Sequence, residues 1–117
     1  MVRRAPYLMV ASMDVDPKRE DLFNEVYDKE HVPNLIRVPG VLSVVRYKRV
    51  ELTMSIAGEV RVMPSSQPKY HAIYELERPD ALVSDSWADA VEVGRWPTEI
   101  RPFTRNRQHT LLKIHGE

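Results

Sequence analysis

The sequence contains no cysteine and only four glycines among its 117 residues. The absence of cysteine excludes disulfide bonds, thiol catalysis and any zinc or iron–sulfur site built on thiolates. With so few, scattered glycines, the chain has no glycine-rich loop of the kind that binds phosphate. A chain of this length buries enough surface to fold without a metal or a disulfide, so we expect one domain over residues 1–117.

The chain has no excess of charge of either sign, because 17 basic residues balance 17 acidic residues. Proteins that bind nucleic acid or anionic membranes normally carry an excess of lysine and arginine. The basic and aromatic pattern of RNA-recognition motifs is also missing from residues 70–75, which read Tyr-His-Ala-Ile-Tyr-Glu. We therefore expect a small molecule or a protein as the partner, and neither nucleic acid nor a membrane.

No hydrophobic run is long enough to span a membrane. The apolar stretch at residues 5–13 follows Arg3 and Arg4, a basic start that signal peptides share, but it ends at Asp14. A spanning helix needs about 20 apolar residues. We interpret this stretch as a buried strand and expect a cytoplasmic protein.

The hydrophobic pattern predicts the order strand, helix, strand, strand, helix, strand. Strands are expected at 7–13, 41–52, 70–77 and 103–114, and helices at 16–37 and from 79 to Gly94. Residues 53–68 are expected to form a loop or a small hairpin that turns at Ala57-Gly58. Two right-handed strand–helix–strand crossovers place both helices on one face of a four-stranded antiparallel sheet, which is the ferredoxin-like α+β arrangement.

The other face of this sheet has no helix to cover it. Alternate residues on both faces of the first three strands include Val, Leu, Ile, Met and Tyr. An apolar sheet face of this size is unusual in a monomer, so we expect a homodimer with the two sheets packed face to face.

The segment with the clearest chemical content is Tyr-Asp-Lys-Glu-His-Val-Pro, residues 27–33. Tyr27 and His31 are four positions apart, so both project from the helix face that packs on the sheet. Pro33 cannot continue the helix regularly, so we expect a kink or break near Val32. His31 is then either a general acid or base beside a cavity or a core histidine hydrogen-bonded to a carbonyl.

Residues 27–33 and the following Val-Pro-Gly-Val, residues 38–41, resemble the dimeric α+β barrel superfamily, especially its EthD-like and muconolactone-isomerase-like branches. The resemblance implies a dimeric barrel. It also implies activities that include lactone isomerisation, polyketide cyclisation, cofactor-free oxygenation and haem degradation. In several branches a histidine at the end of the first helix faces a pocket, a role that would fall on His31 here.

Several other residues are candidates for such a pocket. Tyr47 and Tyr74 could orient a substrate oxygen or fill the core, and Trp96, after the end of the second helix, could cover a cavity. The remaining candidates to bind substrate are Tyr27 and Asn34 on the first helix and Arg105 in the basic row Arg105, Arg107 and His109. That row is alternatively a solvated strand edge.

The four histidines lack metal-binding spacing, and no cofactor is expected. The sequence therefore indicates a small cofactor-independent enzyme that acts on a cyclic or aromatic carbonyl compound. In this hypothesis His31 is the general acid or base, and Tyr74 or Tyr47 stabilises the oxyanion. The alternative is a ligand-binding or assembly module without catalysis on the same scaffold, and haem binding is a further possibility.

Overall fold

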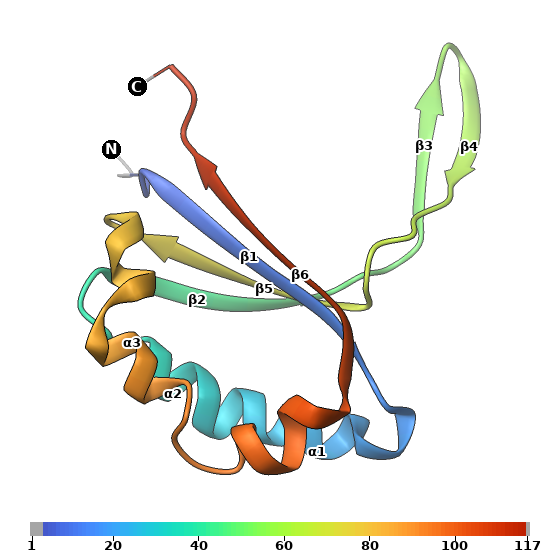
Figure 1. Cartoon of the computed structure of the whole chain (residues 1–117). Helices are drawn as coiled ribbons and strands as arrows, with labels where there is room; N and C mark the ends of the chain where they lie inside the picture. Colours follow the sequence, from blue (N-terminus) through green and yellow to red (C-terminus); the bar gives the residue numbers. More distant parts are fainter. Residues whose placement is uncertain (1–3, 117) are drawn as a thin grey trace.

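A four-stranded antiparallel sheet organises the fold in the computed structural model, which describes residues 4–116 (Figure 1). Its strands are β1 (Tyr7–Val15), β2 (Val41–Lys48), β5 (Tyr70–Leu76) and β6 (Thr104–Lys113), in the order β2-β5-β1-β6. Every helical segment lies on one side of this sheet. The predicted ferredoxin-like α+β fold is therefore confirmed. Arg3, part of the basic start noted above, lies outside the described residues.

The first helical segment comprises η1 (Pro17–Arg19), α1 (Glu20–Val26), η2 (Tyr27–His31) and α2 (Val32–Leu35). Its start is capped by Asp16, whose Oδ1 accepts a hydrogen bond from the Lys18 N–H at 3.0 Å. The expected break near Val32 takes the form of a π-helical turn, η2, in which the Val32 N–H donates to the Tyr27 carbonyl. The helix thus passes Pro33 without ending.

The second helical segment is more divided than the sequence predicts. The single helix expected from 79 to Gly94 is instead η3 (Pro79–Val83) and the short α3 (Asp85–Ala90). The two are separated by Ser84, which is extended and whose hydroxyl accepts the Trp87 N–H at 3.1 Å. Two unpredicted turns follow, the π-helical η4 (Trp96–Ile100) and η5 (Arg101–Phe103).

A hairpin of β3 (Leu52–Ile56) and β4 (Glu59–Met63) interrupts the chain between β2 and β5. It turns at Ala57 and Gly58, which have positive φ angles of 52° and 82°, as a tight two-residue hairpin turn requires. The strand predicted at 41–52 therefore ends earlier, at Lys48. The hairpin projects from the sheet on the side away from the helices (Figure 1).

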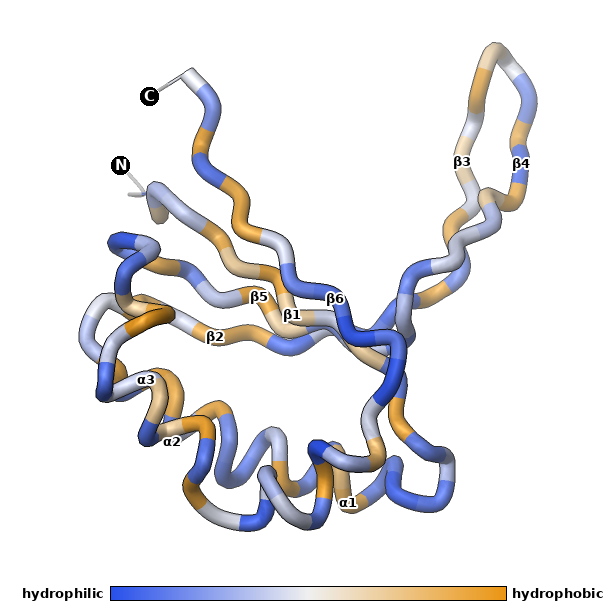
Figure 2. The backbone as a smooth tube through the Cα atoms, viewed as in Figure 1, coloured by the Kyte–Doolittle hydropathy of each residue, from blue (hydrophilic) through white to orange (hydrophobic). Residues whose placement is uncertain are grey.

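The two faces of the sheet differ in what covers them. Met9 and Tyr74 lie side by side on the face toward the helices, where they pack with Phe23 in the core. On the opposite face, Val10, Ile73 and Val45 are aligned in one row, and Val45 is 46% exposed. Figure 2 shows apolar residues recurring along the sheet strands and along the hairpin. The homodimer inferred from this uncovered face stays a prediction.

Glu30 links the first helical segment to the loop between α3 and η4. Its Oε1 accepts the Arg95 N–H at 3.0 Å, and its Oε2 accepts the Arg95 side chain at 2.6 Å. These hydrogen bonds hold the pKa of the Glu30 carboxyl below its usual value. Gly94 has a φ of +76°, and a Cβ at this position would collide with Glu30 Oε1. A side chain at residue 94 would therefore displace the Glu30 carboxylate, whose hydrogen bonds to Arg95 hold the segment that leads into Trp96.

Replacing Glu30 with Ala should release this loop. In a Trp87→Phe background, Trp96 is the one remaining tryptophan, so its emission reports on the loop directly. We expect Glu30→Ala to shift that emission to the red and to lower the Tm. Gly94→Ala should act in the same way, with a cost of about 1–2 kcal/mol from the left-handed backbone alone. The control is Glu51→Ala, at an exposed glutamate directly before β3. An unchanged emission spectrum in Glu30→Ala would refute the role of Glu30 in positioning Trp96.

Candidate functional site

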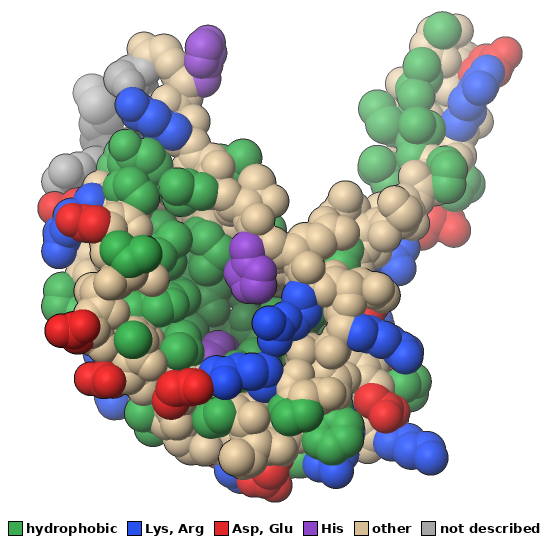
Figure 3. Space-filling model, viewed as in Figure 1, with side chains coloured by type: hydrophobic (Ala, Val, Ile, Leu, Met, Phe, Trp, Pro, Cys, Tyr) green, Lys and Arg blue, Asp and Glu red, His purple; other side chains and the backbone are tan. Residues whose placement is uncertain are grey.

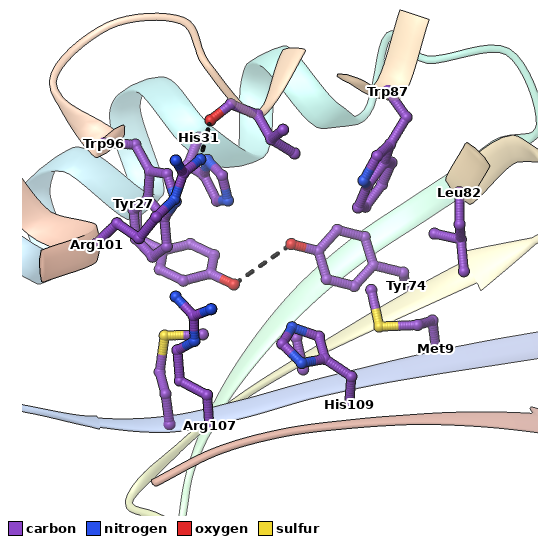
Figure 4. Close-up of a pocket in the computed structure, with 13 residues that line it drawn as sticks. Met9, Tyr27, His31, Tyr74, Leu82, Trp87, Trp96, Arg101, Arg107 and His109 are labelled. Carbon is purple, nitrogen blue, oxygen red and sulfur yellow. Dashed lines mark hydrogen bonds between the residues drawn. The ribbon is translucent and has the colours of Figure 1, made fainter. Parts of the chain in front are cut away.

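A cavity of about 290 Å³ lies between the sheet and the helical layer. Its surface is hydrophobic at depth, with histidine and arginine side chains at its margin (Figure 3). The side chains that surround it come from β1, β5, β6 and both helical segments (Figure 4). They are Met9, Ala11, Met13, Tyr27, His31, Tyr74, Leu82, Trp87, Val91, Trp96, Arg101, Arg107 and His109.

Two π-helical turns supply the aromatic wall of this cavity. The ring of His31, at the end of η2, stacks on the ring of Trp96, at the start of η4, with 4.0 Å between centroids and 16° between planes. Tyr27 packs edge-on against both rings, at 5.0 Å from each. π-Helical turns are rare and are frequent at functional sites. Trp96 is thus part of the wall of the cavity.

The hydroxyl groups of Tyr27 and Tyr74 meet inside the cavity, 3.3 Å apart (Figure 4). Both side chains are buried, and burial raises the pKa of each phenol. The two groups therefore stay protonated, so the pair carries two O–H bonds and only one is used between them. One hydroxyl hydrogen is left to donate to an oxygen of a bound molecule.

His31 is 6% exposed, and its ring points from the helix toward the cavity (Figure 4). Burial lowers the pKa of His31 to about 3, and the positive charges of Arg101 and Arg46 contribute to this lowering. The pKa of His31 therefore lies well below the near-neutral value expected for a general acid or base. Within residues 4–116, Nδ1 of His31 is buried without a hydrogen-bond partner, so the carbonyl contact expected of a purely structural histidine is not made through this atom.

Positive charge gathers at the margin of the cavity. Arg101 reaches it from η5, and both its terminal nitrogens bond to Glu92, at 2.9 and 2.6 Å. Arg107 and His109 reach it from β6. No carboxylate in the described part of the chain pairs with Arg107. The pKa of His109 is lowered by burial and by Arg107, which favours its neutral form. Because Arg101 is paired with Glu92, Arg107 is the positive charge at the margin that is most available to an anion.

Four of the predicted site residues meet at this cavity, and three do not. Tyr27, His31, Tyr74 and Trp96 line it. Tyr47 does not, because it pairs with His71 on the uncovered face of the sheet, where it is 54% exposed. Tyr74 lies on the other face, so these two tyrosines do not share a site.

Arg105 and Asn34 are also outside the lining of the cavity. The register of β1 and β6 shifts between Ser12 and Asp14, and Asn106 has a φ of +53°. This bulge breaks the alternation of the basic row, so Arg107 faces the cavity while Arg105 lies opposite Asp14. Asn34 lies in α2, beyond the π-helical turn that directs His31 inward.

Neither Arg101 nor Trp87 is among the site residues that the sequence predicts. Arg101 lies in η5, a turn that carries no apolar repeat to reveal it, and its partner Glu92 is brought to it only by the fold. Trp87 packs on the ring of Tyr74 at 5.6 Å and lines the cavity as well. A tryptophan on an apolar helical stripe has no sequence signal that separates these roles.

Among residues 4–116, no three His, Asp or Glu side chains are grouped so that they could hold a metal ion. In the same range, no helix has both the length and the apolar character to cross a membrane.

The chain matches no protein-family model and no curated protein sequence. Its structure is similar to that of MhuD, a haem degrader of Mycobacterium tuberculosis with two haems bound in its active site. The TM-score is 0.61 at 11% identity, over 96% of this chain and 98% of MhuD. A variant of MhuD with two manganese protoporphyrin IX molecules per active site gives 0.56 at 11% identity, over 96% and 97%.

An EthD family protein of Bacillus halodurans is also similar, with a TM-score of 0.55 at 14% identity, over 92% of this chain and 97% of that protein. These likenesses span nearly the whole chain and include the EthD-like branch that the sequence resembles. At such low identity they establish the fold, which is ferredoxin-like.

Proposed function

We propose that this protein is a cofactor-independent enzyme for a small cyclic or aromatic carbonyl compound that also carries a carboxylate. The observation that carries the proposal is the convergence on one apolar cavity of a protonated tyrosine pair, a neutral histidine and Arg107, which forms no ion pair within residues 4–116. A few polar groups that converge in an apolar cavity are typical of a small-molecule site.

Each polar group has a distinct role in this proposal. The remaining hydroxyl hydrogen of the Tyr27 and Tyr74 pair donates to the carbonyl oxygen of the substrate. His31 takes a proton from the carbon beside the carbonyl, and the electrons of that C–H bond form the enolate. Because hydroxyl donors stabilise the developing negative charge on oxygen, the tyrosine pair lowers the barrier to this step. Return of the proton from His31 completes an isomerisation or exchange.

The carboxylate of the substrate would act on His31 as well as on Arg107. His31 is in the neutral form that a base requires, but a pKa of about 3 makes it a weak base. The charge of Arg101 contributes to that low pKa. A bound anion near Arg101 and Arg107 opposes this effect, so the pKa of His31 rises when an anionic substrate is present. The charge of the substrate then offsets part of the lowering, of which burial remains the main cause.

Haem, which MhuD binds, fits this cavity poorly. A volume of about 290 Å³ is at the lower limit for drug-sized ligands, and a haem is larger than these. A histidine that binds a metal almost always donates its other ring N–H to a partner. Nδ1 of His31 has no such partner among the described residues, and one ring face is covered by Trp96. The residues of the cavity therefore do not fit a haem.

The same cavity supports a second candidate function, a carrier or sensor of the same ligands, because a buried neutral histidine can bind a ligand without exchanging a proton.

The homodimer expected from the uncovered sheet face is retained as the assembly in which the enzyme acts.

Binding is tested with 4-oxocyclohexanecarboxylate, a cyclic ketone that carries a carboxylate. We expect Arg107→Gln to raise its Kd about tenfold, because a hydrogen bond to a charged group contributes about 1.5 kcal/mol. Arg105→Gln is the matched control from the same strand and should leave the Kd within about twofold. Calorimetry or NMR titration measures both. Equal effects of the two substitutions would contradict the proposed carboxylate contact.

Proton transfer is tested with the same compound in D₂O, by following loss of the proton signals beside the ketone. We expect the protein to accelerate this exchange, His31→Gln to abolish the acceleration, and Tyr74→Phe to reduce it by about 10²-fold, as removal of an oxyanion donor does. Binding without accelerated exchange in the unaltered protein would refute the enzyme and favour the carrier or sensor.

The low pKa of His31 also predicts how stability depends on pH. Below the unfolded pKa of about 6.5 the unfolded chain binds a proton that the folded protein does not bind until about pH 3. The stabilisation from neutral His31 is therefore complete above pH 6.5 and is lost as pH falls toward 3, by up to about 1.4 kcal/mol per pH unit. Between pH 6.5 and 5, the free energy of unfolding measured with denaturant should depend less steeply on pH in His31→Phe than in the unaltered protein. Parallel curves would contradict a buried, neutral His31.

A further inference from the structure

The β3–β4 hairpin is exposed on both of its faces, although both faces carry apolar side chains. Leu52, Met54 and Ile56 alternate along β3, and Val60 and Val62 alternate along β4. The strand register pairs Thr53 with Val62 and Met54 with Arg61, so the apolar residues of the two strands lie on opposite faces. All five apolar side chains are at least 40% exposed.

An exposed hairpin of this kind lacks what normally stabilises a β structure. Two strands alone are at best marginally stable in water, and a third strand or a packed layer is needed. The hairpin forms its own two-stranded sheet and pairs with no other strand among the described residues. It also extends the molecule, since the radius of gyration is 16.1 Å, against about 13 Å for a compact chain of this length.

We propose that this hairpin is an arm that crosses the interface of a homodimer and packs against the second copy of the chain. The proposal rests on the homodimer inferred above and adds the segment that completes its interface. The arm stands beside the uncovered face of the sheet, on the side away from the helices (Figure 1). A partner seated on that face would therefore lie against the arm as well.

The dimensions of the arm agree with this arrangement. Sheets that pack face to face are about 10 Å apart, and five strand residues extend about 17 Å. The β3 and β4 strands have five residues each, so an arm that leaves the sheet on its uncovered side reaches past the partner's sheet. In a twofold dimer each copy contributes one arm, so both apolar surfaces of each copy are covered at once.

The number of residues also favours a second copy as the partner. The four sheet strands have 9, 8, 7 and 10 residues and present about half of these, roughly 17, on the uncovered face. A stable interface takes about 20–30 residues from each partner. The sheet face alone falls short of that range, and the arm brings it within the range. The balanced 17 acidic and 17 basic residues leave no net charge to repel an identical copy.

The oligomeric state of polar variants tests the arm. We expect the unaltered protein to sediment as a dimer and Met54→Ser with Ile56→Ser to raise the dimer dissociation constant at least tenfold. Val83→Ser is the matched control, because Val83 is 84% exposed in η3 on the helical side, and it should leave the constant unchanged. Val45→Lys, at the centre of the uncovered face, should yield monomers.

Amide hydrogen exchange supplies a second measurement that needs no change in the hairpin. We expect the amides of β3 and β4 to exchange slowly in the unaltered dimer and quickly in Val45→Lys monomers, because an isolated hairpin opens readily. Equally fast exchange in both proteins would refute the arm, even if the hairpin variant failed to fold.

The outcomes separate the arm from the proposals on which it rests. A monomer at micromolar concentration in the unaltered protein would overturn the dimer and the arm together. A dimer that Val45→Lys dissociates, but that Met54→Ser with Ile56→Ser leaves intact, would overturn the arm alone. Binding of 4-oxocyclohexanecarboxylate, measured on the same samples, reports on the cavity independently of both.

Discussion

The stacking of His31 on Trp96 is the contact on which the site depends. It joins the end of one π-helical turn to the start of the other, and Tyr27 packs edge-on against both rings. The stack buries His31, and burial is the main cause of its low pKa. One contact therefore both shapes the cavity wall and decides the charge of the group most suited to move a proton.

The cavity combines an uncharged interior with a positive margin. The interior groups with polar atoms, Tyr27, Tyr74 and His31, are all held neutral by burial. The positive charges of Arg101 and Arg107 lie at the edge, on η5 and β6. A molecule that enters with its apolar ring inward and its anionic group outward satisfies both parts. The cavity therefore selects ligands that have an apolar end and an anionic end, as well as a suitable size.

Much of the fold was predictable because it depends on short-range patterns. Apolar alternation located the strands, Asp16 marked the first helix, and Ala57-Gly58 marked the hairpin turn. Helical spacing also placed Tyr27 and His31 on one face. These features depend on neighbours within a few positions, and the sequence carries that information directly.

The rest depends on contacts between distant segments. Tyr47 and Tyr74 both alternate within apolar strands, and only the register shows that they lie on opposite faces. Because of a single bulge at Asn106, Arg107 faces the cavity and Arg105 does not. The pKa of His31 depends on Trp96, 65 positions further along the chain, and on Arg101 in a turn that no pattern marked. Strand register, bulges and burial are properties of the folded chain, and local propensity does not encode them.

The π-helical turn before Pro33 has a consequence for how the chain tolerates change in length. Such a turn holds one more residue than a turn of regular helix, and each residue of a regular helix advances the side chains by about 100° around the axis. A turn that takes one more residue advances each residue by less than this, so the segments before and after it stay nearly in register. Loss of one residue between Tyr27 and His31 would therefore close the widened turn into regular helix and leave the segment after it nearly in place. The same loss within α1 has no such turn to absorb it and would rotate His31 by about 100° away from the indole of Trp96.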